Sequence, residues 1–343
     1  MFAPSPVLTV TIEAGPDRPE VHLHPGGQGF WVARMAANLG AEVVLCCPLG
    51  GEPGRVLWGL LEAEPLTVRA ADGGTPNGVY VHDRRSGQRV EVVSVASRPL
   101  TRHASDELYG IALSAGLDAD ATLLTGCQPD DLVDADLYRR LASDLAGNRK
   151  LVIADLTGPP LLATLQGRVE LLKLSEEELI RDGHVTSGSV PDLVAGAEAL
   201  RGAGARRVVI SRGADPVMFL DDGADPIELA APVFEALDQR GAGDSMFAAI
   251  GVGLARGMTP IDAVRLGMAA GALNVTRRGL GTGTRDEIER LARTSKPHPR
   301  ARLPRLPSAS KPSTRHDDDR DDPAAPTHRR MSPGEPGRHP LMR

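Results

Sequence analysis

The chain has 343 residues, of which 41% are hydrophobic and only 3% aromatic, so its core must consist mainly of Ala, Val, Leu and Ile, as in packed parallel sheets and their covering helices. Residues 295–343 contain 11 of the 39 Lys and Arg but 6 of the 45 Asp and Glu, a net charge of +5, which leaves −11 for residues 1–294. This acidic body argues against general binding of polyanions, so we expect no nucleic-acid partner and only a local phosphate site.

Apolar runs rich in β-branched residues alternate with segments of helical period along the first two thirds of the chain. The predicted strands are 7–12, 42–47, 121–125, 150–154, 169–174 and 207–211. The predicted helices are 28–39, 54–63, 105–116, 133–146 and 189–203. This alternation predicts βα units that feed a mainly parallel sheet with helices on both faces, an α/β fold of the doubly wound kind.

Two regions interrupt this alternation. Residues 66–71 and 78–95 are predicted to form short strands of a small accessory sheet, and residues 216–232 are predicted to form a β-meander. Two long helices rich in Ala and Gly follow, at about 242–256 and 260–276. The body of the chain is therefore predicted to end on a helical layer.

The composition changes at about residue 295. Ten of the 28 prolines lie in the last 49 residues, interspersed with Arg, His and Asp. Segments of this kind do not bury enough apolar surface to fold. We therefore predict one domain over residues 1–294 and a disordered tail over residues 295–343.

Truncation after Thr294 is expected to leave the melting temperature and the activity nearly unchanged, because the removed segment lacks the apolar residues needed to pack on the domain. Thermal unfolding and steady-state kinetics of the truncated chain check this prediction. A fall in the unfolding midpoint of several degrees, on the order of 1 kcal/mol or more for a domain of this size, would instead show that the tail packs on the domain.

The cysteines and the N-terminus indicate the compartment. Cys46, Cys47 and Cys127 include no C-x-x-C pair, and adjacent cysteines are poorly placed for a mutual bridge, so reduced thiols are expected. The N-terminus has no basic segment followed by an apolar run, and no stretch approaches the roughly 18 uncharged apolar residues of a membrane span. We therefore expect a cytoplasmic protein without a membrane partner.

The motif with the clearest chemistry is Gly-Ala-Gly-Asp at the start of the predicted helix 242–256. The backbone N–H groups of Gly241, Ala242 and Gly243 are free to approach an anion at the positive end of that helix. Asp244 is then placed to accept the proton of a hydroxyl that attacks a phosphoryl group held by these amides. The structural alternative is a glycine-containing loop followed by a helix-stabilising Asp.

This motif resembles the second signature of the ribokinase-type (phosphofructokinase-B) carbohydrate kinases, nearest in layout to the 1-phosphofructokinase and tagatose-6-phosphate kinase group. Five further segments between residues 7 and 294 follow the family's pattern in order. They are Gly26-Gly27-Gln28-Gly29, Leu124-Thr125-Gly126, Asp155-Leu156-Thr157-Gly158, Lys173-Leu174-Ser175-Glu176-Glu177-Glu178-Leu179 and Ile210-Ser211-Arg212-Gly213-Ala214. The resemblance implies a three-layer ribokinase-like fold with a small β lid. It also implies that ATP and Mg²⁺ are used to phosphorylate a hydroxyl of a sugar or sugar-like small molecule.

The resemblance assigns roles to individual residues. On the nucleotide side these residues are Lys173, Ser175, Glu178, Ser211, Gly213, Asn274 and Gly279, with Glu178 acting on Mg²⁺ through water. On the acceptor side they are Asp17, Gly26, Gly27, Gln28 and Trp31. Structural alternatives remain, because Ser175 and Glu178 also form a capping-box pattern, Asn274 suits a buried core amide, and Gly26 and Gly27 suit a simple turn.

The acceptor side departs from the pattern of the 1-phosphofructokinase group. Asp17, a sugar-hydroxyl ligand in the family, is kept. However, the Lys that would pair with a substrate phosphate is Gln28, the Asn that would bond the sugar is Trp31, and a phosphate-binding Arg is replaced by Pro76. The phosphoryl-transfer end keeps its motif, so we expect retained chemistry on a changed acceptor.

The expected protein is therefore an ATP-dependent carbohydrate kinase with Asp244 as general base and the Gly241–Gly243 amides as an anion hole. Its lid is expected to come from about 13–23 and 66–95, and a homodimer formed through this lid is one assembly that the resemblance allows. The alternative is a catalytically weak ligand-binding or regulatory protein on the same fold. A dinucleotide oxidoreductase fits poorly, because no G-x-G-x-x-G follows the first strand.

Overall fold

The computed structural model describes residues 1–230, 240–276 and 281–294, and its main sheet has six strands in the order β12-β11-β10-β9-β8-β7. Strands β7 to β10 are parallel, whereas β11 and β12 are antiparallel to their neighbours. The strands are β7 (Ala121–Thr125), β8 (Leu151–Asp155), β9 (Leu171–Ser175), β10 (Val208–Arg212), β11 (Asp215–Leu220) and β12 (Ile227–Leu229). The predicted parallel sheet and the late meander are both present.

The N-terminal residues extend this sheet. Phe2 forms parallel bridges to Leu124 of β7 and to Cys46 of β3 (Val44–Leu49), and its N–H donates to the carbonyl of Leu123 at 2.9 Å. Strand β3 pairs in parallel with β4 (Thr67–Asp72). The expectation that residues 66–71 belong to the accessory sheet is therefore wrong, because these residues continue the main sheet beyond Phe2.

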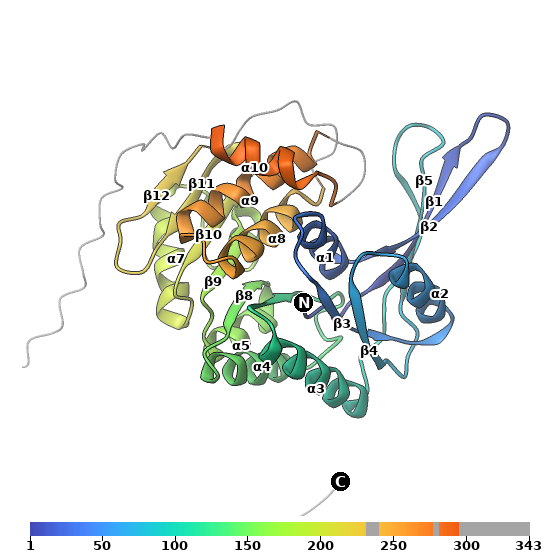
Figure 1. The fold of residues 1–343 in the computed structure, drawn as a ribbon, viewed down its shortest axis with the longest axis horizontal. Helices are drawn as coiled ribbons and strands as arrows, with labels where there is room; N and C mark the ends of the chain where they lie inside the picture. The colour runs from blue at the N-terminus through green and yellow to red at the C-terminus, as the bar shows by residue number, and fades with distance from the viewer. Residues whose placement is uncertain (231–239, 277–280, 295–343) are drawn as a thin grey trace, which may run out of the picture. The chain divides into compact units, whose positions relative to one another are not determined.

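Helices cover both faces of the main sheet, as predicted (Figure 1). Helices α3, α4, α5 and α7 pack on one face, and α1, α8, α9 and α10 pack on the other. The helices are α1 (Gln28–Asn38), α2 (Gly51–Glu62), α3 (Arg102–Asp118), α4 (Ala135–Gly147), α5 (Gly158–Gly167), α6 (Glu176–Arg181), α7 (Val190–Ala203), α8 (Ala242–Ala255), α9 (Pro260–Asn274) and α10 (Arg285–Thr294). Helices α5 and α10 were not predicted from the sequence.

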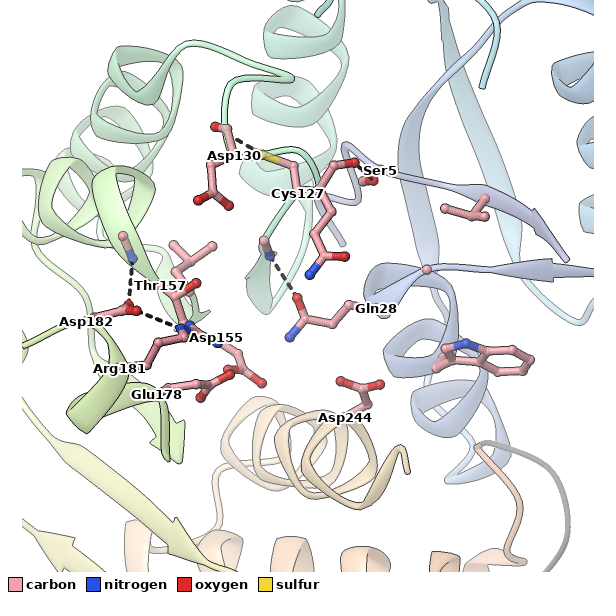
Figure 2. A pocket seen from close by; sticks show the side chains of 17 residues that line it. Ser5, Gln28, Cys127, Asp130, Asp155, Thr157, Glu178, Arg181, Asp182 and Asp244 are labelled. Atoms are coloured by element: carbon pink, nitrogen blue, oxygen red, sulfur yellow. Dashed lines mark hydrogen bonds and ion pairs between the residues drawn. The ribbon is translucent and has the colours of Figure 1, made fainter. Parts of the chain in front are cut away.

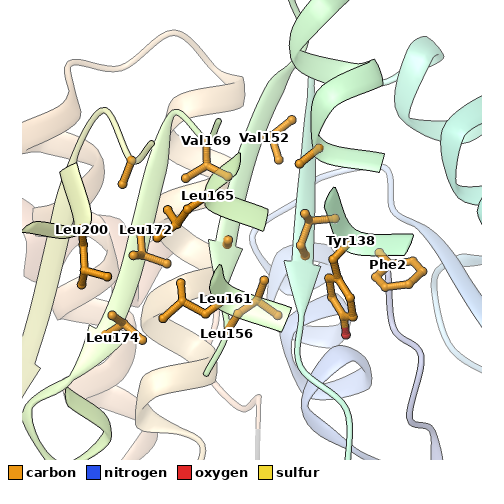
Figure 3. Packing of buried hydrophobic residues seen from close by; sticks show 14 of the residues in the cluster. Phe2, Tyr138, Val152, Leu156, Leu161, Leu165, Val169, Leu172, Leu174 and Leu200 are labelled. Carbon is orange, nitrogen blue, oxygen red and sulfur yellow. The ribbon is translucent and has the colours of Figure 1, made fainter. Parts of the chain in front are cut away.

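The two cores follow from the alternation of side chains along each strand. In β8, Val152 and Ala154 belong to the core under α4 and α5, whereas Ile153 belongs to the core under α8 and α9. Figure 3 shows the first of these cores, in which Phe2 and Tyr138 meet edge to face with ring centroids 5.2 Å apart. The Tyr138 hydroxyl donates to the carbonyl of Thr125 at 2.9 Å, which fixes the end of β7.

A second sheet has four strands in the order β2-β1-β5-β6. They are β1 (Val7–Ala14), β2 (Pro19–Gly26), β5 (Gly78–Asp83) and β6 (Val90–Val95). The expectation that residues 7–12 feed the main sheet is therefore wrong. An alternating strand pattern does not say which sheet a strand joins, and here Phe2 occupies the place beside β7 that this strand would take.

Other features of the described residues bear on the earlier expectations. The three cysteines are buried and unpaired. The second late helix, predicted to reach residue 276, ends at Asn274. No helix in the part of the chain that the structure describes is long and apolar enough to cross a membrane.

Candidate active site

A cavity of about 550 Å³ lies where β7 and β8 end, between the first turns of α1 and α8 (Figure 2). The carboxyl ends of parallel strands are the usual location of ligand sites in such sheets. The predicted residues Gly27, Gln28, Trp31, Glu178 and Asp244 all line it. Segments far apart in the sequence thus meet at one site, as the order of the motifs implied.

The start of α8 is held in place by its backbone. Gly241 is the N-cap residue with a φ of 70°, a left-handed conformation that favours glycine, and its carbonyl accepts from the N–H of Ser245 at 2.8 Å. A Cβ atom at position 243 would lie only 2.9 Å from Nζ of Lys173, so a side chain there would displace this ammonium group. Asp244 follows in the first helical turn and points into the cavity (Figure 2).

Asp244 belongs to a group of carboxylates with unusual acidity. Burial, reinforced by the nearby charges of Asp155 and Glu178, raises the pKa of Asp244 to about 7. Burial and the charge of Glu178 also raise the pKa of Asp155 to about 6. Both carboxyl groups therefore titrate within the range in which proton transfer to a base is useful.

Lys173 partly balances these carboxylates. Its Nζ lies 3.0 Å from Oδ2 of Asp155, and both side chains are buried. Burial alone lowers the pKa of Lys173, but the adjacent carboxylates, Asp155 foremost, raise it above its usual value. The ammonium group therefore stays charged beside Gly243, at the start of α8.

Gln28 connects α1 to the end of β7 and to the carboxylates. Its Oε1 accepts from the N–H of Gly126 at 2.9 Å. Hydrogen bonding from Gln28 lowers the pKa of both Asp155 and Asp244, although less than burial raises it. The side chain is thus fully engaged with the protein, and it carries no charge for a substrate phosphate.

The far side of the cavity was not predicted. Asp130, Arg181 and Asp182 line it in addition to the carboxylates named above. Nε of Arg181 lies 2.9 Å from Oδ1 of Asp182, whose Oδ2 accepts from the N–H of Gly158 at 2.9 Å. Among the described lining residues, Arg181 is the single cation against five carboxylates, so the cavity is acidic.

The predicted capping box at α6 is confirmed. Oγ of Ser175 accepts from the N–H of Glu178 at 3.2 Å, and Oε2 of Glu178 accepts from the N–H of Ser175 at 2.8 Å. Glu178 also lines the cavity, so the structural role does not exclude a functional one.

The carboxylates of this cavity fit a magnesium ion. Oxygen ligands are those that Mg²⁺ prefers, and five carboxylates line the cavity, so a divalent cation would offset part of their charge. Among the described residues, no group of three or more His, Cys, Asp or Glu side chains is arranged to hold a metal ion. A cation bound through water and substrate phosphates, as Mg²⁺ usually is, remains compatible with this arrangement.

Of the other predicted acceptor-side residues, Trp31 lines the cavity, whereas Gly26 and Asp17 do not. Trp31 lines the cavity and packs edge to face on Phe30, with ring centroids 4.8 Å apart. Gly26 packs on Thr9, since a Cβ there would lie 2.4 Å from Oγ1 of Thr9. Asp17 is exposed in the turn between β1 and β2 and does not line the cavity. The strand register puts Gly26 at the opposite end of that hairpin, about 23 Å along the strands, so Asp17 lies far from the cavity in this structure.

Apart from Glu178, the predicted nucleotide contacts that the structure describes do not line this cavity. Ser211 and Gly213 sit at the turn between β10 and β11. Asn274 is buried, and its amide is fully used: Nδ2 donates to the carbonyl of Arg240 at 2.7 Å, and Oδ1 accepts from the N–H of Gly281 at 3.1 Å. These contacts are those of a core amide that anchors the segment before Gly241. Gly279 lies outside the described residues.

Comparisons with known proteins find similar sequences over most of the chain. The sequence profile described as pfkB family carbohydrate kinase matches residues 9–287. The chain is 32% identical over 303 residues to the ATP-dependent 6-phosphofructokinase isozyme 2 of Mycobacterium tuberculosis, covering 84% of this chain and 86% of that protein. It is 26% identical over 272 residues to the 1-phosphofructokinase of Vibrio cholerae, covering 78% of this chain and 84% of that protein.

A solved structure shows the same fold. The crystal structure of phosphofructokinase-2 from Escherichia coli in complex with potassium superposes with a TM-score of 0.72 at 26% identity, covering 85% of this chain and 96% of that chain. The expected ribokinase-like architecture with a mainly parallel sheet is confirmed by this similarity and by the strand order.

Proposed function

Because the chain belongs to the pfkB family of carbohydrate kinases, enzymes that phosphorylate a sugar with ATP, we propose that Asp244 is the general base of this reaction. The observation that carries the proposal is the placement of Asp244 in the first turn of α8, facing the cavity, with its pKa raised to about 7. Such a carboxylate accepts a proton at neutral pH and loses it again to solvent.

The start of α8 would hold the phosphoryl group in transfer. The N–H groups of Gly241, Ala242 and Gly243 lie at the positive end of the helix, and the ammonium group of Lys173 is packed beside Gly243. Amides and an ammonium group fixed before the reaction stabilise charge that develops on the phosphoryl oxygens. Asp244 then removes the proton of the attacking hydroxyl from the same helical turn.

The nucleotide would lie between the start of α8 and the ends of β9 and β10. Glu178 would hold Mg²⁺ through water, and the ion would neutralise charge on the phosphates of ATP. Ser175 and the β10–β11 turn with Ser211 and Gly213 would contact the nucleotide. Asn274 acts on this site indirectly, because it fixes the carbonyl of Arg240 one residue before the anion hole.

The acceptor would enter beside Gly27, Gln28 and Trp31. Trp31 offers an aromatic face for an apolar side of a sugar ring. Because the surrounding cavity has five carboxylates and a single arginine that is already paired, we propose an acceptor without a phosphate group at the position where fructose 1-phosphate carries it. This side of the cavity distinguishes the chain from the 1-phosphofructokinase pattern.

The pH dependence of kcat/KM tests the role of Asp244. A general base acts when it is deprotonated, so activity is expected to rise with pH through a midpoint of about 7 and to reach a plateau above it. The profile of kcat/KM reports the free enzyme, in which this pKa applies. A profile that is flat across this midpoint would contradict the assignment.

Measurement of turnover distinguishes an active kinase from the alternative, a catalytically weak ligand-binding protein. A kinase forms ADP in proportion to the phosphorylated acceptor, whereas a binding protein shows ligand affinity without ADP formation. A screen of free sugars, polyols and nucleosides for acceptor-dependent ADP formation therefore distinguishes the two, and we expect at least one uncharged acceptor to give sustained turnover.

We further propose that the chain forms a homodimer through the sheet β2-β1-β5-β6. Four valines of β6 and two apolar residues of β2 are 45–63% exposed, an unusual concentration on one small sheet. They are Val90, Val92, Val93, Val95, Val21 and Leu23. A second copy of the same sheet would bury them in a two-fold interface.

The Val93→Asp variant is expected to weaken this dimer at least about tenfold in dissociation constant, because it places an unpaired charge in an apolar interface. Sedimentation velocity across a concentration series checks the prediction. Leu162→Asp, an equally drastic change at an exposed position of α5, is the matched control. A chain that is monomeric at all concentrations, or equal effects of both variants, would contradict the proposed interface.

A further inference from the structure

A second cavity lies at the N-terminal ends of the parallel strands, whereas the candidate active site lies at their C-terminal ends. Its volume is about 770 Å³, and it is lined by the first residues of β8, by the segment leading into β9 and by the C-terminal ends of α4, α5 and α7. Strand β8 runs from Leu151 in this cavity to Asp155 in the other, a span of about 13 Å. The two cavities are therefore separate sites.

Two arginines in this cavity have an unusual backbone. Arg149, with a φ of 60°, and Arg168, with a φ of 69°, are the two non-glycine residues with positive φ in the part of the chain that the structure describes. Both line the cavity, one after α4 and the other at the end of α5. The left-handed conformation is unfavourable for a residue with a Cβ atom and is normally taken by glycine at the end of a helix.

Other helices of the chain follow that rule. Gly40, Gly183 and Gly257 take the corresponding position after α1, α6 and α8, each with a positive φ. A favourable interaction of a cation with the helix dipole requires only a basic residue in the last turn and not the left-handed position. The backbone of Arg149 closes α4 in the same way, because its N–H donates to the carbonyl of Ala146 at 2.9 Å and that of Lys150 donates to the carbonyl of Leu145 at 3.0 Å. Helix termination thus accounts for this backbone, but it does not require an arginine side chain.

The charges in the cavity leave these two guanidinium groups without partners. Each carboxylate that lines the cavity is already paired: Glu198 with Arg201 at 3.0 Å, and Asp222 and Glu170 with Arg206 at 3.1 and 3.3 Å. Within residues 1–230, 240–276 and 281–294, neither of the two arginines has an ion-pair partner. Lys150 also lines the cavity, and its Nζ donates to a carbonyl oxygen, that of Ala119, at 3.3 Å.

We propose that this cavity binds a small molecule with a phosphate group, held by the guanidinium groups of Arg149 and Arg168. The planar fork of Arg matches two phosphate oxygens, and a charge-assisted contact to such a dianion is among the strongest polar interactions in proteins. Residues 1–294 as a whole carry a net charge of −11, whereas the described residues that line this cavity include five Lys and Arg against three Asp and Glu, and this local excess of cations suits an anion.

The test removes the two guanidinium groups without straining the backbone. In the Arg149→Gly, Arg168→Gly double variant each substitution introduces the residue that the left-handed conformation favours, so the fold is expected to be at least as stable as in the parent. Arg55→Ala, Arg102→Ala is the control, since both of these arginines are exposed and lie away from the cavity. Inorganic phosphate and glycerol 3-phosphate are titrated into the full-length parent and into both variants by calorimetry.

The parent and the control are expected to bind at least one of the two probes. The double variant is expected to bind it at least about 100-fold more weakly, roughly tenfold for each lost guanidinium group, with unchanged KM for ATP. Preference for glycerol 3-phosphate would indicate a phosphate ester as the natural ligand, and equal affinity would indicate free phosphate. Equal binding to the parent and the double variant, or no binding of either probe to the parent, would overturn the proposal.

Discussion

The Asp244→Asn variant is expected to lower kcat by about 10²–10⁴, the usual contribution of a general base, while the fold and the affinity for ATP are kept. Asparagine has the shape of aspartate but cannot take the proton of the acceptor hydroxyl. Because burial and neighbouring carboxylates raise the pKa of Asp244, its charge is unfavourable in the folded chain above about pH 7. Removing that charge is therefore expected to leave the unfolding midpoint unchanged or to raise it.

Asp262→Asn is a matched control for this variant. Asp262 occupies the first turn of α9 as Asp244 occupies that of α8, but it is bonded to Thr259 and Arg265 and does not line the cavity. Its loss is expected to change kcat by no more than a few-fold. An Asp244→Asn variant that turns over its acceptor within a few-fold of the parent would remove Asp244 from the mechanism.

Fructose 1-phosphate and tagatose 6-phosphate are expected to be poor acceptors, with kcat/KM at least about 10²-fold below that of the best uncharged acceptor. Each charge-assisted contact to a phosphate contributes roughly 1.5–3 kcal/mol, and the positions that supply such contacts in the 1-phosphofructokinase group are Gln28, Trp31 and Pro76 here. Two arginines of the N-terminal third that could replace them are already paired. Arg34 is paired with Glu64 at 2.9 Å, and Arg85 is paired with Asp83 at 2.6 Å.

We attribute the low expected kcat/KM on sugar phosphates to the negative charge of the cavity, and one variant tests this explanation. Asp130→Asn removes a carboxylate of the cavity wall, so it is expected to raise kcat/KM for fructose 1-phosphate several-fold relative to the uncharged acceptor. Steady-state kinetics on both substrates measures the ratio. An efficient kcat/KM of the parent on fructose 1-phosphate, within the ordinary range of about 10⁴–10⁸ M⁻¹s⁻¹, would contradict the acceptor assignment.

The elements of the main sheet and the phosphoryl-transfer motif could be predicted because their signals are local. Strands β7 to β10 lie close to their predicted positions, and the capping box of Ser175 and Glu178 depends on residues three positions apart. The Gly-Ala-Gly-Asp motif likewise contains the amides of the proposed anion hole and the carboxylate of Asp244 at one helix start.

The remainder depends on contacts between distant segments. The sequence of β1 does not show that Phe2 takes the place beside β7, and so it does not show that β1 joins the second, four-stranded sheet. The position of Asp17 follows from the register of the β1–β2 hairpin rather than from its motif. The size of the cavity's negative charge depends in part on Asp130 and Asp182, which are far apart in the sequence and line one cavity only in the folded chain.

The central claim is that the cavity at the start of α8 transfers phosphate from ATP to an uncharged sugar hydroxyl through Asp244. Transfer of the labelled γ-phosphoryl group of ATP to a panel of free and phosphorylated sugars, with the parent and the Asp244→Asn variant side by side, tests this claim most directly. The account predicts a labelled ester with at least one uncharged acceptor for the parent and a rate about 10²–10⁴-fold lower for the variant. Equal labelling by both proteins, or labelling by the parent of sugar phosphates alone, would contradict it.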